Sequence, residues 1–209
     1  MKKFFFSLAA MALMSIGSMA SAANLVDNGS FEDDVITNYY SIVNAGTNGL
    51  NKWDVGGTSI DIVSDLGNNS HHWAIDGDQA IDLAGTPGPG SISQDIEAVL
   101  GEAYFLTFQY SSNGSGQAAA LEVYWGGALI ATLDTPAQDT WNTFRAIVMG
   151  SVSPTTLTLV TANASNAGPL VDDVSVAAVP EPTSIALLGF SLAGAIGFGW
   201  RRRKQAAKA

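Results

Sequence analysis

The chain has 209 residues, with nine Lys or Arg and nineteen Asp or Glu. Seven of the nine bases lie at the two ends, so residues 23–179 carry two bases against eighteen acids, a formal charge of −16. This acidity excludes the basic face that nucleic acid or anionic lipid would need. The absence of cysteine excludes disulfides, thiolate catalysis and zinc–thiolate sites.

The first 22 residues have the order of a secretory signal peptide. Lys2 and Lys3 precede an apolar run from Phe4 to Ile16, and the small residues that follow end in Ala20-Ser21-Ala22. The A-x-A site formed by Ala20 and Ala22 predicts cleavage after Ala22. A first transmembrane helix is the alternative, but the apolar run is short for a membrane span and ends in a processing site.

Between residues 24 and 176 the apolar residues alternate with a period of two, and turn residues separate the runs. In residues 103–110, for example, Tyr104, Leu106 and Phe108 fall on one face. No segment in this region shows a sustained helical period. Many short strands without helices predict an all-β, jelly-roll β-sandwich for residues 23–179. The expected strands are residues 24–26, 59–63, 79–83, 91–96, 103–110, 121–125, 128–133, 141–149, 155–161 and 170–176.

Two short motifs open and close this region. It begins with Asn24-Leu25-Val26-Asp27-Asn28-Gly29-Ser30-Phe31-Glu32 and ends with Val171-Asp172-Asp173-Val174. A start of Asn-x-x-x-Asn-Gly-x-Phe-Glu and an end of Val-Asp-Asp-Val resemble the galactose-binding-like jelly rolls, which include many carbohydrate-binding modules. The segments 76–85, 90–94 and 101–108 resemble more particularly the group named choice-of-anchor C. The resemblance covers about residues 24–178 and implies a sandwich fold, but this group lends no biochemical activity.

The closing motif is expected to bury a carboxylate. Asp172 has the parity of Leu170, Val174 and Val176, so its side chain should point inward, whereas Asp173 should not. A carboxylate that faces a core must be neutralised, hydrogen-bonded or bound to a cation, because burying it bare is costly.

A cation is a plausible partner because only Lys52 and Arg145 supply positive charge within the region. In the resembling modules a structural calcium joins the glutamate after Asn-Gly-x-Phe to the first aspartate of the closing pair. The resemblance therefore implies a Ca²⁺ site at Glu32 and Asp172, with backbone carbonyls completing the oxygen shell. The alternatives are a salt bridge to Arg145 or acceptance of backbone amides near a sheet end.

Recognition of a sugar would need exposed aromatic rings, whose faces stack on the C–H surfaces of sugars, with amides and carboxylates for the hydroxyl groups. Trp125 and Trp141 share the parity of core residues and are expected to be structural. Burial is also the alternative for each of the five aromatic residues in or beside turn-rich segments, which are the ligand-binding candidates: Trp53, Trp73, Tyr39, Tyr40 and Tyr124.

The sequence carries no signature of an enzyme. His71 and His72 are its two histidines, so a site built from several imidazoles is excluded and a surface loop is expected there. There is no nucleophile elbow, phosphate-binding loop or dinucleotide fingerprint. A glycosidase with paired carboxylates stays open as an alternative, because eighteen acids offer many pairs.

The C-terminus carries a second apolar segment, Thr183 to Trp200, followed by Arg201-Arg202-Arg203-Lys204. As a helix it would reach about 27 Å, enough to span a bilayer core. The basic cluster would keep residues 205–209 in the cytoplasm. Pro180-Glu181-Pro182 stands just before the segment and forces an extended, accessible conformation.

The order of Pro-Glu-Pro, glycine-rich apolar helix and arginine cluster over residues 180–204 resembles the PEP-CTERM sorting signal. In that family an exosortase, a membrane-embedded enzyme similar to cysteine transpeptidases, recognises the tail. The resemblance implies cleavage near the Pro-Glu-Pro motif and release or transfer of the outer domain in bacteria that make extracellular polysaccharide. An ordinary single-span anchor with a proline-rich linker is the alternative.

These features predict an exported protein. Signal peptidase and an exosortase would process the chain, the C-terminal helix would hold it transiently in the inner membrane, and the domain would end at the cell surface or outside the cell. The leading hypothesis is a non-catalytic module that binds, or is embedded in, extracellular or cell-wall polysaccharide. The second is a structural matrix or adhesion protein that binds other proteins or itself, and the third is a carbohydrate-active enzyme.

Overall fold

The computed structural model describes residues 22–66, 72–114, 120–151, 154–161 and 167–180. The predicted signal peptide and the predicted membrane segment lie outside these residues, and no helix within them could cross a membrane. The described residues form eleven β-strands: β1 (Tyr40–Asn44), β2 (Asp54–Gly57), β3 (Ser59–Ser64), β4 (Gln79–Asp82), β5 (Gly90–Ile96), β6 (Ala103–Ser112), β7 (Ala120–Trp125), β8 (Ala128–Asp134), β9 (Asn142–Met149), β10 (Thr155–Thr161) and β11 (Pro169–Ala178).

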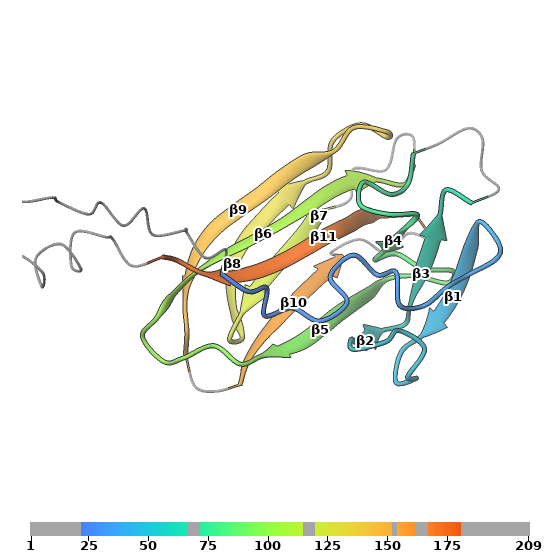
Figure 1. The fold of residues 1–209 in the computed structure, drawn as a ribbon. Coiled ribbons are helices and arrows are strands. Elements are labelled where there is room, and N and C mark those ends of the chain that lie inside the picture. Colours follow the sequence, from blue (N-terminus) through green and yellow to red (C-terminus); the bar gives the residue numbers. More distant parts are fainter. Residues whose placement is uncertain (1–21, 67–71, 115–119, 152–153, 162–166, 181–209) are drawn as a thin grey trace, which may run out of the picture.

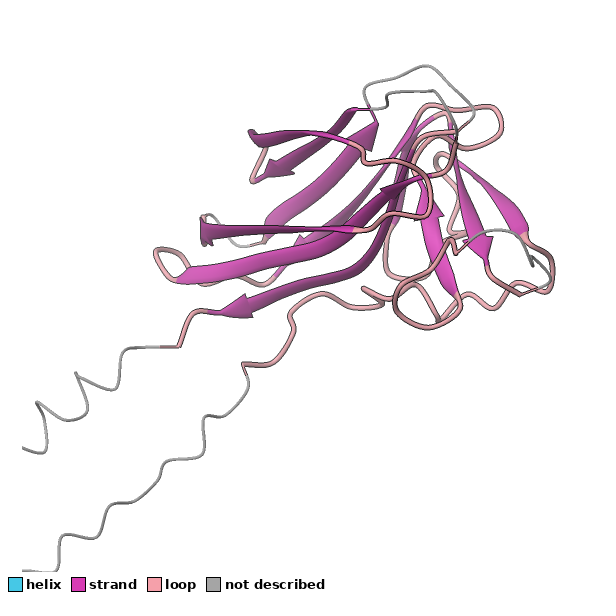
Figure 2. Ribbon diagram, turned by 90° about the horizontal axis from the view of Figure 1, so that it is seen from above, coloured by secondary structure: helices cyan, strands magenta, loops and turns pink. Residues whose placement is uncertain are grey.

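The strands form two antiparallel sheets that pack face to face (Figures 1 and 2). The six-stranded sheet has the order β1-β3-β4-β11-β6-β9, and the five-stranded sheet has the order β2-β5-β10-β7-β8. The last strand, β11, thus lies between β4 and β6 and joins the two halves of its sheet. The arrangement confirms the predicted all-β sandwich.

The main hydrophobic core lies between the sheets and is filled by alternate residues of the strands. β6 contributes Tyr104, Leu106 and Phe108 from one sheet, and β10 contributes Leu157 and Leu159 from the other. All five side chains are buried. Removal of this apolar surface from water is the main force that holds the two layers together.

The two tryptophans expected to be structural are packed in different places. Trp125 belongs to the main core, and its Nε1–H donates to the carbonyl of Met149 at 2.8 Å. Trp141 is half-buried and packs against a second, smaller cluster that includes Val63 and Leu170. This cluster lies on the face of the six-stranded sheet that is turned away from the main core, which we call the outer face.

Nine of the ten expected strands are present, with ends that differ by at most two residues. The exception is residues 24–26, which form only an isolated bridge between Asn24 and Ala177. Two strands were not expected, β1 and β2, and both lie at sheet edges. β1 is exposed at three of its five residues, and two of the four residues of β2 are glycine, so neither shows a clear buried alternation.

A bulge in β11 changes which of its residues face the core. Directly after Asp172 the register against β6 shifts, and Asp173 has a φ of 50°. Val174 and Val176 belong to the main core, whereas Leu170 belongs to the cluster on the outer face. The expectation that Asp172 shares a face with Val174 and Val176 is therefore wrong, because a bulge inserts one extra residue into the strand. Asp172 is buried, as expected, and Asp173 is exposed.

Candidate functional site

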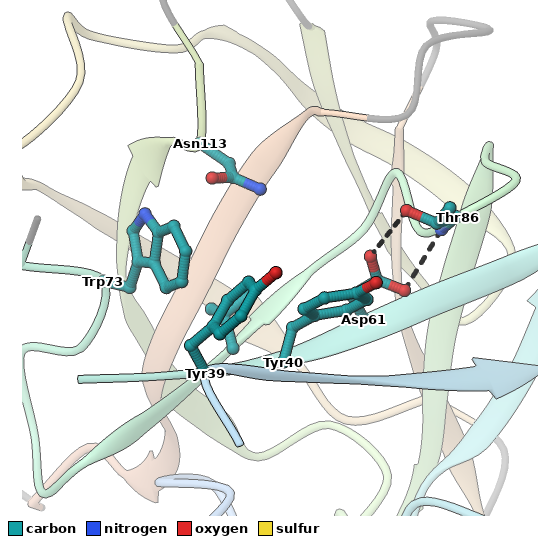
Figure 3. Close-up of a pocket in the computed structure, with 7 residues that line it drawn as sticks. Tyr39, Tyr40, Asp61, Trp73, Thr86 and Asn113 are labelled. Atoms are coloured by element: carbon teal, nitrogen blue, oxygen red, sulfur yellow. Dashed lines mark hydrogen bonds between the residues drawn. The ribbon is translucent and has the colours of Figure 1, made fainter. Parts of the chain in front are cut away.

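One end of the outer face is hollowed by a cavity of about 160 Å³, which we call the aromatic pocket. The sheet order assembles it from segments far apart in the chain. β3 forms the floor, the start of β1 lies beside it, and the connection after β4 and the end of β6 complete the wall. The lining residues are Tyr39, Tyr40, Asp61, Val63, Trp73, Thr86 and Asn113 (Figure 3).

Three aromatic rings line the pocket together. The ring centroids of Tyr39 and Tyr40 lie 4.9 Å apart, and those of Tyr39 and Trp73 lie 6.2 Å apart. Tyr40 is held by its pairing with Val63 across β1 and β3, and Trp73 by its packing against the outer-face cluster. Tyr39 is 53 % exposed, so the pocket presents an accessible ring surface to solvent.

The floor of the pocket carries a hydrogen-bonded carboxylate. Asp61 of β3 accepts the backbone N–H of Thr86 through Oδ1 at 3.1 Å and the Thr86 hydroxyl through Oδ2 at 3.0 Å (Figure 3). Burial raises the pKa of Asp61, and the two bonds from Thr86 oppose that shift. These two hydrogen bonds fix the connection after β4 against the edge of the pocket.

A second carboxylate lies directly opposite Asp61 across β3 and β4. Asp82 is fully buried, and its Oδ1 accepts the N–H groups of Ala84 at 2.8 Å and Gly168 at 3.1 Å. Its Oδ2 accepts from the side-chain amide of Asn113. Burial raises the pKa of Asp82 to about 7 against the lowering effect of these bonds. Asp82 therefore positions Asn113, whose amide borders the pocket.

Trp53 does not belong to this site. It is only 3 % exposed, its ring centroid lies 5.5 Å from that of Phe31, and its Nε1–H donates to the carbonyl of Asn28 at 3.0 Å. It borders a second hollow of about 320 Å³ lined by residues 48 and 50–54. The expectation of an exposed ring is wrong for Trp53, because its indole fills the main core and its polar edge is bonded there.

Tyr124 lies on the other sheet. It is half-buried on β7, where Leu121, Val123 and Trp125 take the core positions, and its hydroxyl donates to Oε2 of Glu122 at 2.8 Å. The structure thus brings Tyr39, Tyr40 and Trp73 together and leaves Tyr124 apart.

Sequence reasoning missed the polar part of the pocket. Asp61, Thr86 and Asn113 belong to no recognisable motif, because the fold brings them together from three distant segments. One signal was available: Asp61 interrupts the apolar run Ile60-Asp61-Ile62-Val63, and an acid in a strand of this kind must have a partner.

Glu32 and Asp172, the predicted calcium ligands, hold the two ends of segment 75–79. Asp172 Oδ2 accepts the first two N–H groups of the segment at 2.8 and 2.9 Å. Glu32 Oε1 accepts the last two at 2.8 and 2.7 Å. Burial raises the pKa of Asp172 to about 7, the amide bonds lower it, and the charge of Asp76 raises it further. This segment follows Trp73, so the two carboxylates also position one wall of the aromatic pocket.

Glu32 and Asp172 both accept hydrogen bonds from backbone amides, which was one of the two alternatives to a calcium site. Arg145 lies elsewhere, with its guanidinium 6.0 Å from the ring centroid of Phe105. The described part of the chain contains no group of three or more acidic or histidine side chains arranged to hold a metal ion. A calcium ion at Glu32 and Asp172 would need backbone carbonyls and water for most of its oxygen shell. Calcium stays a prediction for these two residues.

Residues 24–177 match the family model described as "Protein of unknown function (DUF642)", which covers well over half of the chain. The chain belongs to the DUF642 family. The match covers nearly the same residues as the resemblance to choice-of-anchor C. Behind the DUF642 domain, residues 178–204 match the model described as the PEP-CTERM protein-sorting motif, which confirms the predicted sorting signal and indicates export. The comparison with curated proteins finds no match.

The DUF642 domain is similar in structure to several carbohydrate-binding modules. The CBM22-1 xylan-binding domain from Paenibacillus barcinonensis Xyn10C has a TM-score of 0.50 at 14% identity, with 79% of this chain and 100% of that chain covered. Family 16 Carbohydrate Binding Module-2 has a TM-score of 0.48 at 17% identity, covering 73% and 99%. A family 35 module from Clostridium thermocellum has a TM-score of 0.43 at 18% identity, covering 65% and 97%. The first similarity supports the sandwich fold of the DUF642 domain.

Proposed function

We propose that this chain is exported and sorted by an exosortase, and that its DUF642 domain is a non-catalytic module that binds neutral polysaccharide in the aromatic pocket. One observation carries the binding proposal: Tyr39, Tyr40 and Trp73 converge from separate segments around a solvent-accessible hollow. Aromatic rings in a hollow with a few fixed polar groups are the usual composition of a site for a small organic ligand.

The chemistry of the lining matches a sugar ring. The ring of Tyr39 offers an apolar face for the C–H side of a sugar. The carboxylate of Asp61 accepts, and the amide of Asn113 can donate or accept, hydrogen bonds from hydroxyl groups. Thr86 fixes the Asp61 side chain and Asp82 fixes the Asn113 side chain. Because both are already ordered, they lose little conformational entropy when the ligand binds.

Charge selects against acidic polysaccharides. Asp61 lines the pocket, and Lys52 and Arg145 are the two bases among residues 23–179, against eighteen acids. A uronic acid or sulfate group would meet repulsion there, and none of the described lining residues is a Lys or Arg that could pair with it. Neutral polysaccharide is therefore the favoured class.

The lining also supports a binding role over catalysis. Asp61 is the single carboxylate among the described residues that line the pocket, and both of its oxygens accept hydrogen bonds from Thr86. Hydrolysis of a glycosidic bond normally needs two carboxylic groups that flank it. The sorting tail and the similarity to the fold of a xylan-binding domain give independent support to a place among extracellular polysaccharides.

Affinity electrophoresis of residues 23–180 through gels that contain soluble polysaccharide tests the binding proposal. The gels would contain xylan, β-1,4-galactan, β-1,4-mannan or the extracellular polysaccharide of the producing cells. We expect at least one neutral polysaccharide to retard the wild type and Tyr39→Ala to weaken that binding tenfold or more, about 1.4 kcal/mol. Tyr124→Ala is the matched control, because it removes a tyrosine from the other sheet, and it should bind as the wild type does.

Three outcomes would contradict the proposal. Equal migration of Tyr39→Ala and wild type in a retarding gel would move the site away from the aromatic pocket. Self-association without retardation in any gel would favour the adhesion protein. Release of reducing sugar that depends on one carboxylate would favour the enzyme.

A further inference from the structure

The outer face becomes apolar at the end where the chain leaves the domain. Across β11, β6 and β9, the row Ser175, Thr107 and Arg145 is polar. The next row toward the chain exit is Ala177, Phe105 and Ile147, and Met149 lies beyond it opposite Ala103. Just beyond β11, the backbone N–H of Val179 donates a hydrogen bond to the carbonyl of Ala103 at 2.9 Å.

The loop before β6 places two more apolar residues at the same end of the sheet. Val99 and Leu100 are both exposed, and the loop is fixed to the end of β9 by the bond from Gly101 N–H to the carbonyl of Gly150 at 2.9 Å. Leu100 is 73% exposed and Ile147 is 65% exposed. One exposed aliphatic side chain is common on a protein surface, whereas several gathered at one end of a sheet indicate a contact surface. We call this surface the exit patch: Val99, Leu100, Phe105, Ile147, Met149 and Ala177.

We propose that the exit patch rests on the membrane in which residues 183–200 are inserted, at the level of the lipid headgroups, until the sorting enzyme cuts the chain. This inference rests on the proposed sorting function, because it requires residues 183–200 to span the membrane. The proposed partner of the exit patch is the lipid headgroup layer, and not another protein.

The short connection between the domain and the predicted membrane span supports the membrane as the partner of the exit patch. Val179 is still bonded to Ala103, and the predicted span begins at Thr183. Four residues can extend over at most about 14 Å. The headgroup layer on each side of a bilayer is roughly 5–8 Å thick. The exit end of the domain is therefore held within about 10 Å of the headgroup layer, close enough for an apolar surface at that end to reach it.

The charges around the patch fit a headgroup position. Arg145 stands in the last polar row, with its guanidinium over Phe105, where it can reach a lipid phosphate. Glu97 and Glu102 in the exposed loop oppose deeper entry into the hydrocarbon. Because the body of the domain is acidic, the tether and the apolar contact, and not attraction to anionic lipid, would hold it there.

Quenching by labelled lipid tests the proposal in the chain that exists before sorting, residues 23–209. The chain has no cysteine, so a single bimane label can be attached at Leu100→Cys or Ile147→Cys. Val35→Cys and Ile130→Cys are controls at exposed apolar residues outside the patch. Each protein is reconstituted in phosphatidylcholine vesicles with and without phosphatidylcholine that carries a nitroxide near its headgroup. We expect quenching at Leu100 and Ile147 to exceed that at both controls by at least twofold.

Equal quenching at all four positions would overturn the proposal, as would crosslinking of two copies through the patch with no excess quenching. The variant Met149→Ser with Ile147→Ser should keep the melting temperature and lose the excess at Leu100, since both residues are exposed. Insertion is checked separately by flotation after alkaline extraction. A chain that does not float with the vesicles refutes the membrane span on which the sorting proposal depends, whereas a chain that floats without excess quenching refutes only the exit patch.

Discussion

Asp82 and Asp172 are two carboxyl groups with no exposed surface, and burial raises the pKa of each to about 7. Their ordinary value in an unfolded chain is about 4. The folded domain therefore holds extra protons between about pH 4 and pH 7. The resulting stabilisation is complete below about pH 4 and is lost as the pH rises through 7. We expect the free energy of unfolding of residues 23–180 to fall from pH 5 to pH 8 by on the order of a few kcal/mol, as measured by urea denaturation with a chelator present.

Asp82→Asn keeps residue 82 neutral at every pH, so its stability should fall by about half as much over this range, because Asp172 still titrates. Asp134→Asn removes an exposed acid and is the matched control, which should fall as the wild type does. Two results would contradict the raised pKa values as the cause of this decline. One is a wild type that is equally stable at pH 5 and pH 8, and the other is a decline in Asp82→Asn as large as in the wild type.

A calcium ion at Glu32 and Asp172 would have the opposite effect on stability, because it would stabilise the domain at high pH, where both carboxylates are ionised. If the ion is bound, a chelator lowers the melting temperature at pH 8, and Asp172→Asn removes that response, because metal bound to the folded state alone stabilises it. Differential scanning calorimetry with and without chelator measures both effects. A wild type whose melting temperature does not change with chelator or added Ca²⁺ would leave the backbone amides of segment 75–79 as the sole partners of these carboxylates.

The connection after β4 positions Thr86, and its path depends on Gly85. A Cβ at Gly85 would lie 2.5 Å from the backbone carbonyl carbon of Ile60, which cannot move without displacing β3. Gly85→Ala should therefore cost about 1–3 kcal/mol of stability, measured by chemical denaturation. It should also weaken polysaccharide binding, because the connection that carries Thr86 is pushed away from Asp61.

Gly114→Ala is the matched substitution on the other side of the pocket. Its Cβ would meet only the methyl of Ala167 at 3.3 Å, so we expect a small effect. If Gly85→Ala were as stable as Gly114→Ala and bound polysaccharide equally well, the close packing of this connection on β3 would not govern the pocket.

At the level of strands, alternation of apolar residues was sufficient to predict most of the fold. It succeeded for β10 and for residues 103–108 of β6, in which every second side chain is buried. It failed for β2, where Val55 alone is buried, and for the face of Asp172, because a single residue at φ 50° shifts the register of β11. Alternation predicts which side chains are buried only as long as the strand stays regular.

The aromatic pocket was only half predictable from the sequence. Tyr39, Tyr40 and Trp73 stood out as aromatic residues in turn-rich segments, but so did Trp53 and Tyr124, and burial and sheet position separate the two groups. The polar partners of the pocket depend on long-range pairing, which no local pattern reports.

In the whole molecule, the aromatic pocket and the exit patch occupy opposite ends of one sheet face. Figure 1 shows β1 and β3, which carry the pocket, at the end of the sheet opposite to the end of β11. β11 runs from Leu170 near the pocket to Ala177 in the patch, about 23 Å of extended strand. A domain seated on the membrane by the exit patch would hold its binding pocket away from the lipid, toward the surrounding polysaccharide. Export, sorting and binding are then consistent with a single orientation.

The distribution of the protein in cultures of the producing cells tests the central claim most directly. Cells would express the full chain, either as wild type or as Tyr39→Ala, and the polysaccharide fraction, the medium and the cells would be analysed by intact mass. We expect wild-type protein of the mature mass, lacking the signal peptide and the tail, in the polysaccharide fraction, and Tyr39→Ala of the same mass in the medium. Full-length protein retained inside the cells, or an identical distribution of the two proteins, would contradict the account.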